Sequence, residues 1–91
     1  MNSLDQLRIR YRQGLAKDVQ ALEAARASLP AADARASLEH VAHQLRGSGA
    51  SYGFPEITEC AKRLEQAAPG EHSEHATALL SVLRPLVLEG P

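Results

Sequence analysis

The chain has 91 residues with 10 basic and 11 acidic side chains, which gives a formal net charge of -1. This length suits one domain, and the near-neutral charge lacks the basic excess that is typical of a nucleic-acid-binding protein. Apolar residues make up 44% of the chain and aromatic residues only 3%. Because Ala and Leu dominate and β-branched residues are few, this composition favours helix over sheet.

No apolar run approaches the ~20 residues that are needed to cross a bilayer. The polar, periodic segment 1–10 does not resemble a signal peptide. The single cysteine, Cys60, excludes an internal disulfide and fits a reducing compartment. We therefore expect a cytoplasmic protein that contacts no membrane, although a cytoplasmic fragment of a longer, membrane-anchored chain would have the same features.

Four helices are predicted, in chain order. The first runs from about Ser3 to Ser28, where apolar residues recur at three- and four-residue steps. Its stripe consists of Leu4, Leu7, Tyr11, Leu15, Val19, Leu22, Ala25 and Leu29. Pro30 interrupts the pattern, and Asp33 is expected to cap a second helix that runs from about Ala34 to Tyr52.

A third helix is expected to begin at Pro55 and to end near Ala68, before a Pro-Gly pair. A fourth runs from about Ser73 to Leu88, and Pro85 inside it should kink the last turn or end the helix early. Four amphipathic helices with short connections predict an all-α fold, an antiparallel up-and-down four-helix bundle in a single domain over residues 1–91.

One histidine lies on the polar side of the second helix. On a helical wheel with Val41 at zero, Leu45 and Leu38 fall at about 40° and 60°, whereas His43 falls near 200°. The imidazole should therefore face solvent in the middle of the helix. Glu39 and Arg46 flank it, one turn before and one turn after.

Three glycines follow this histidine closely, although glycine within a helix costs roughly 0.5–1 kcal/mol relative to alanine. Gly47 lies one turn past His43 and leaves open the space beside the imidazole, as a site needs when another protein must come close. Gly49 lies toward the core, where it favours close helix packing. Gly53 is expected to end the helix.

This arrangement suits phosphoryl transfer. A neutral imidazole nitrogen is a competent nucleophile near pH 7, and Arg46 can place a guanidinium against phosphoryl oxygens. The chain lacks a Walker-type loop, a kinase glycine-rich loop and an acidic cluster for magnesium. It is therefore expected to be a carrier with no cofactor of its own and no kinase activity, and the partner supplies the magnesium and the acyl-phosphate aspartate.

The segment resembles the signature of histidine-containing phosphotransfer (HPt) domains. That signature is a histidine, a hydrophobe two residues later, a basic residue, a glycine, and then a second glycine and a hydrophobe ten and eleven residues past the histidine. The matching residues are His43, Leu45, Arg46, Gly47, Gly53 and Phe54. Arg46 stands where lysine is commoner in the family, which keeps the charge.

The resemblance implies a four-helix bundle that exchanges phosphoryl groups with the aspartates of receiver domains, in hybrid sensor kinases, in response regulators or in both. It implies His43 as the phosphorylated residue, with Arg46 beside the phosphoryl group. Gln44, next to His43 in the sequence, could orient or contact the phosphoryl group or be a plain surface residue. The partner is expected to dock on one face of the second helix, together with a nearby strip of the first or third helix. This face consists of Ala36, Glu39, His40, His43, Gln44, Arg46, Gly47 and Ala50.

Other interpretations remain open from the residues alone. The chain could be a helical interaction or regulatory module without phosphoryl chemistry, and His43 a solvated surface side chain. His40 with His43, and His72 with His75, have a spacing that can bind zinc, but no third ligand is apparent. His72 and His75 are expected to lie in solvent near the start of the fourth helix.

Overall fold

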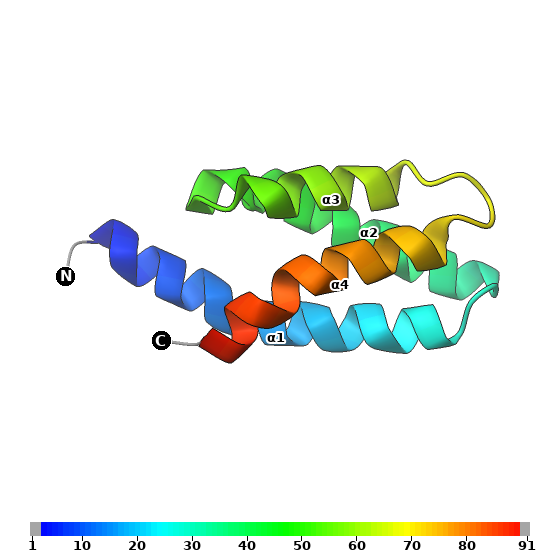
Figure 1. Ribbon diagram of the computed structural model, residues 1–91, viewed down its shortest axis with the longest axis horizontal. Coiled ribbons are helices and arrows are strands. Elements are labelled where there is room, and N and C mark those ends of the chain that lie inside the picture. Colours follow the sequence, from blue (N-terminus) through cyan, green and yellow to red (C-terminus); the bar gives the residue numbers. More distant parts are fainter. Residues whose placement is uncertain (1–2, 90–91) are drawn as a thin grey trace.

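The computed structural model describes residues 3–89, and all regular elements within that range are helices, as the sequence predicts. It contains α1 (Ser3–Ala27), α2 (Ala32–Ser48), a short 3₁₀ helix η1 (Ala50–Tyr52), α3 (Pro55–Glu65) and α4 (His72–Glu89). Consecutive α-helices run in opposite directions, which gives the expected antiparallel up-and-down bundle (Figure 1). The four terminal residues of the expected domain, 1–2 and 90–91, lie outside the described part.

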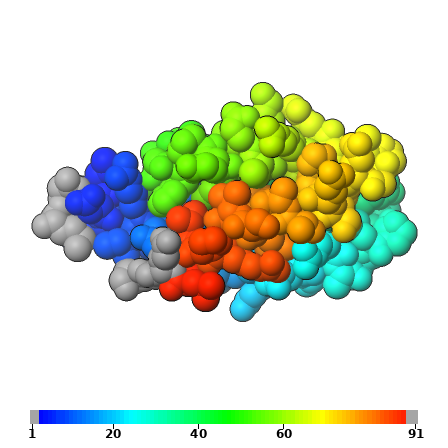
Figure 2. Space-filling view, viewed as in Figure 1, coloured from blue at the N-terminus to red at the C-terminus, as the bar shows by residue number. Residues whose placement is uncertain are grey.

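Each α-helix packs mainly against two neighbours: α1 and α3 both pack against α2 and α4. In the space-filling view α4 fills the space between α1 and α3 and closes the core on that face (Figure 2). The core is made almost entirely of leucine and alanine side chains. The largest fully buried ones are Leu15, Leu22, Leu38, Ile57, Leu64, Leu79, Leu80 and Leu83. Burial of each large aliphatic side chain contributes about 1.5–3 kcal/mol, so these stripes orient every helix.

The end of α2 differs from the sequence prediction. We expected one helix to Tyr52, but α2 ends at Ser48 and a turn of 3₁₀ helix follows. In a continuous α-helix the Ala50 N–H would donate to the Arg46 carbonyl. Here the Thr58 hydroxyl lies between them: it accepts from Ala50 N at 2.8 Å and donates to Arg46 O at 3.1 Å. A side chain inserted into the hydrogen-bond ladder in this way interrupts an α-helix.

The first turns of α1 also differ from expectation. Leu4 and Leu7 were assigned to the core stripe, yet they are 48% and 44% exposed. The reason is length: the N-terminal end of α1 extends beyond the ends of α2 and α3 (Figure 1), so the bundle covers these two side chains only in part. The stripe becomes a buried core at Leu15, further along the helix.

Several predicted helix ends are displaced as well. α3 ends at Glu65, three residues before Ala68. Ala31 occupies the N-cap of α2 without a side-chain cap, and Asp33 lies in the first turn, where its charge suits the helix dipole. Pro85 does not end α4, which continues to Glu89.

An aromatic cluster closes one end of the bundle. Tyr11 of α1 stacks on Tyr52 at a centroid distance of 4.5 Å and on Phe54 at 5.8 Å. Its hydroxyl shares a 2.8 Å hydrogen bond with Ser48, and burial raises its pKa, so it stays protonated near neutral pH. Gly53 lies between Tyr52 and Phe54 in the sequence and ends the 3₁₀ turn. It adopts φ 90°, a left-handed conformation that favours glycine. The cluster fixes where α2 gives way to α3.

Gly47 in the last turn of α2 and Gly49 at its C-cap are predicted to respond oppositely to substitution by alanine. A Cβ on Gly49 would lie 2.8 Å from Thr58 Oγ1 and 2.9 Å from Thr58 N, so Gly49→Ala must displace α3 and should cost about 1–3 kcal/mol. A Cβ on Gly47 would meet nothing within 4 Å, so Gly47→Ala should gain about 0.5–1 kcal/mol. Urea unfolding of both variants measures this. Equal effects of the two substitutions would contradict the packing described here.

Candidate functional site

α2 presents His43 to solvent. Its neighbours Val41, Ala42 and Leu45 are buried against the other helices, while the His43 side chain is 64% exposed. This is the orientation that the helical spacing predicts. The imidazole therefore lies in the middle of a helix that its own core stripe holds in place.

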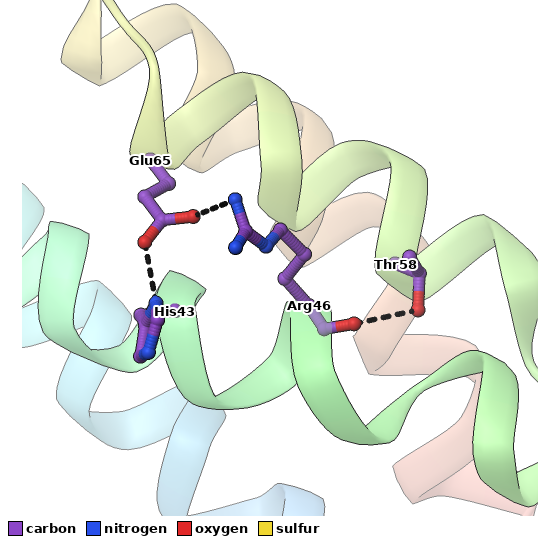
Figure 3. Close-up of polar contacts among 4 residues, drawn as sticks. All are labelled: His43, Arg46, Thr58 and Glu65. Carbon is purple, nitrogen blue, oxygen red and sulfur yellow. Dashed lines mark hydrogen bonds and ion pairs between the residues drawn. The ribbon is translucent and has the colours of Figure 1, made fainter.

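A carboxylate that the sequence did not indicate contacts this imidazole. Glu65, the last residue of α3, brings Oε2 to 2.6 Å from His43 Nδ1 and Oε1 to 2.7 Å from Arg46 Nη1. Figure 3 shows the carboxylate between the two side chains, with one oxygen directed at each. The Glu65 side chain is only 21% exposed, so this bridge is partly shielded from solvent.

The bridge distinguishes the two nitrogens of the ring. A carboxylate accepts hydrogen bonds and donates none, so Nδ1 of a neutral His43 must carry the proton and donate to Glu65. Nε2 is then the nitrogen that carries the lone pair. Of the two ring nitrogens, Nε2 is therefore the one that can act as a nucleophile.

Arg46 lies beside His43, as the sequence indicates, but its guanidinium is held by Glu65. Its side chain is 40% exposed, so it keeps access to solvent. The backbone at this point is also fixed, because the Thr58 hydroxyl of α3 donates to the Arg46 carbonyl (Figure 3). Two contacts from one face of α3 therefore set the position of this turn of α2.

The remaining candidates on the predicted docking face fall into two groups. Five are exposed on α2 or η1: Ala36, His40, Gln44, Gly47 and Ala50. The space at Gly47 is open, as predicted, because a Cβ there would meet no atom within 4 Å. Glu39, the sixth candidate, contacts His72 of α4 instead of His43, and its side chain is 44% exposed.

Glu39 contacts a histidine that was expected to lie in solvent. His72 is instead 4% exposed, and its Nε2 lies 2.7 Å from Glu39 Oε2. The expectation was wrong because His72 begins α4 directly after the loop, at a point where the chain turns back onto α2. His75, three residues further along α4, is half-buried. Cys60 of α3 is partly buried and packs against the core.

The residues missed from the sequence share one property: each acts between helices. Thr58 and Glu65 are seven residues apart on α3 and so lie on the same face of that helix. That spacing of two polar residues was the available signal. It indicates a polar seam, but it does not say which turn of α2 the seam meets.

Burial raises the pKa of the Asp18 carboxyl in α1. Within residues 3–89, no group of three or more metal-binding side chains comes together that could hold a metal ion. No helix in that range combines the length and apolar character needed to span a membrane.

Comparison with protein-family models matches the Hpt domain over residues 6–87, nearly the whole chain. The match includes every helix that builds the bridge between His43, Arg46 and Glu65. No curated protein and no solved structure matches the chain.

Proposed function

The chain belongs to the Hpt domain family, and on that premise we propose that His43 carries a phosphoryl group between the aspartates of receiver domains in a two-component phosphorelay. The observation that carries the proposal is the exposed imidazole whose Nδ1 is held by Glu65, which leaves the lone pair on Nε2. Membership in the family implies histidine phosphotransfer and receiver partners; the assignment to His43 is ours.

The chemistry follows from the ring. Nε2 attacks the phosphorus of the receiver's aspartyl phosphate, a nitrogen–phosphorus bond forms, and the bond to the aspartate oxygen breaks. The electron pair of the broken bond leaves on the aspartate carboxylate. Such transfer depends on positioning and on neutralisation of charge, and magnesium in the receiver's own acidic site supplies part of that neutralisation. We assign no cofactor to this chain.

The docking face is proposed to be the exposed side of α2. Gly47 and the small side chains of Ala36 and Ala50 leave this surface low around the imidazole. Gln44 is exposed next to His43 and is proposed as a contact to the phosphoryl group or to the receiver. Glu39 borders the face, held by its hydrogen bond to His72.

The second candidate function is a helical interaction or regulatory module without phosphoryl chemistry. The exposed α2 face would serve either function. The Glu65 bridge favours the carrier, since a surface that only binds has no need for a histidine ring held in one tautomer. Independent kinase activity is not proposed, because the chain has no nucleotide-binding motif.

We predict that His43→Gln abolishes transfer of label from a receiver domain that was radiolabelled with acetyl phosphate. The variant should melt near the wild-type temperature, because the His43 side chain is exposed and an exposed ion pair contributes only about 0–1 kcal/mol. The measurement is the label that this chain retains after electrophoresis. His40→Gln, an exposed histidine one turn away, is the matched control and should accept label normally.

Full labelling of the His43→Gln variant would reject His43 as the carrier. Incubation of the wild-type protein with ATP alone gives a second control and should leave it unlabelled.

We predict that Gly47→Gln folds but transfers poorly. A Cβ at Gly47 would meet no atom within 4 Å, and the position is exposed, so the stability should stay within about 1 kcal/mol of wild type. The same side chain would occupy the approach to His43, and a misplacement of about 1 Å can lower the transfer rate roughly a hundredfold. Time courses of phosphoryl transfer, quenched at set times, measure the rate, and urea unfolding measures the stability.

Gly47→Ala is the control, because it adds a Cβ that is too short to reach the approach to His43. This variant should retain most of the transfer rate. Normal transfer by Gly47→Gln would place the docking face elsewhere.

A further inference from the structure

We propose that a cavity at one end of the bundle binds a small carboxylate that carries a hydroxyl group next to its carboxyl group. The cavity has a volume of about 240 Å³ and lies where the connection from α1 to α2 meets the start of α4 (Figure 1). Its lining consists of Leu29, Pro30, Arg35, Gly70, His72 and Ser73. The proposal is independent of phosphoryl transfer by His43.

Two residues that line this cavity carry buried polar atoms without a partner. Within residues 3–89, three buried side-chain polar atoms lack a hydrogen bond: Arg35 Nε, Glu65 Oε1 and His72 Nδ1. Glu65 Oε1 has its ion pair with Arg46, whereas the other two atoms have no such contact. Because buried polar groups in proteins are almost always hydrogen-bonded, two unpartnered atoms at one cavity indicate that it binds a polar ligand.

The Arg35 side chain determines the charge of that ligand. It is half-buried, and its guanidinium forms no ion pair within the part of the chain that the structure describes. His72 and Ser73 are the first two residues of α4, so the positive end of that helix dipole lies at the same cavity. A guanidinium binds a carboxylate through two parallel hydrogen bonds, so these groups favour a carboxylate ligand.

The His72 ring determines which second group the ligand needs. Its Nε2 lies 2.7 Å from Glu39 Oε2, and a carboxylate only accepts hydrogen bonds, so the neutral ring carries its proton on Nε2. Nδ1 then keeps a lone pair, and the ligand must donate to it. An ammonium group would bring a second cation close to the unpaired Arg35, so a neutral hydroxyl group fits better.

The apolar lining and the volume limit the rest of the ligand. Leu29 packs against the core and, with Pro30, gives the cavity an apolar wall. Sites for drug-sized ligands have volumes of about 300–1,000 Å³, so a cavity of about 240 Å³ suits a smaller molecule with a short aliphatic chain. 2-Hydroxy-3-methylbutanoate combines the carboxylate, the hydroxyl group and such a chain.

The test is a titration of the nitrogen-labelled full chain with 2-hydroxy-3-methylbutanoate, followed through the backbone amide NMR signals of Gly70 and Ser73. Three further probes each lack one part of this ligand. 3-Methylbutanoate lacks the hydroxyl group, 3-methyl-2-butanol lacks the carboxylate, and inorganic phosphate lacks the aliphatic chain. The comparison of the two acids tests His72 Nδ1 from the side of the ligand, without a substitution at a buried residue.

Two variants test the guanidinium. Arg35→Gln removes its charge, and the control Arg63→Gln removes the same charge from an exposed position on α3. Urea unfolding confirms that both variants fold. Should Arg35→Gln fail to fold, Arg35→Lys replaces it, because lysine keeps the charge but loses the paired hydrogen bonds.

We expect saturable shifts at Gly70 and Ser73 with the hydroxy acid, and binding of 3-methylbutanoate that is weaker by about tenfold or more. The alcohol and inorganic phosphate should give no saturation. Arg35→Gln should also bind the hydroxy acid about tenfold or more weakly, whereas Arg63→Gln should bind it as the wild-type protein does.

Unchanged signals at Gly70 and Ser73 throughout the titration would overturn the proposal, since water alone would then serve the two unpartnered atoms. Equal affinity for the two acids, or equal binding by Arg35→Gln and the wild-type protein, would overturn it as well. Tighter binding of inorganic phosphate than of the hydroxy acid would indicate a simple anion site and would contradict the proposed ligand.

Discussion

The Glu65 carboxylate, placed between α2 and α3, is the contact on which the site depends. One oxygen accepts from His43 Nδ1 and the other pairs with Arg46, so a single side chain fixes the ring orientation and the place of the positive charge. Neither of these two residues could hold its position alone, because both are on the exposed side of α2. The core positions the two helices, and the contact with Glu65 then fixes the orientation and the tautomer of the His43 imidazole.

A second hydrogen bond between a carboxylate and an imidazole lies one turn earlier along α2. Glu39 of α2 hydrogen-bonds to His72 at the start of α4. Glu65 at the end of α3 hydrogen-bonds to His43 of α2. The two pairs therefore attach both ends of the connection 66–71 to adjacent turns of α2. The Thr58 hydroxyl adds a third attachment, at the end of α2, where it interrupts the helix. The exposed histidine thus lies on a helix that is fixed along its length by polar contacts as well as by the core.

The sequence predicts well what repeats along one helix. The bundle, the outward direction of His43 and the open space at Gly47 all follow from the spacing of apolar residues. It predicts poorly what depends on the register between helices. Glu65 and the buried His72 could not be placed because their partners lie 22 and 33 residues away. Leu4 and Leu7 were misassigned for a related reason, since periodicity shows a face but not whether a neighbour reaches it.

We propose that Glu65 occupies Nδ1 of His43 and leaves Nε2 free for the phosphoryl group. The most direct test is an NMR measurement of phosphorus–nitrogen coupling in the phosphorylated protein with a nitrogen-labelled His43 ring. The bridge predicts coupling of the phosphorus to Nε2, with Nδ1 still hydrogen-bonded to Glu65. A phosphoryl group bonded to Nδ1 would require the bridge to be absent in solution and would contradict this account.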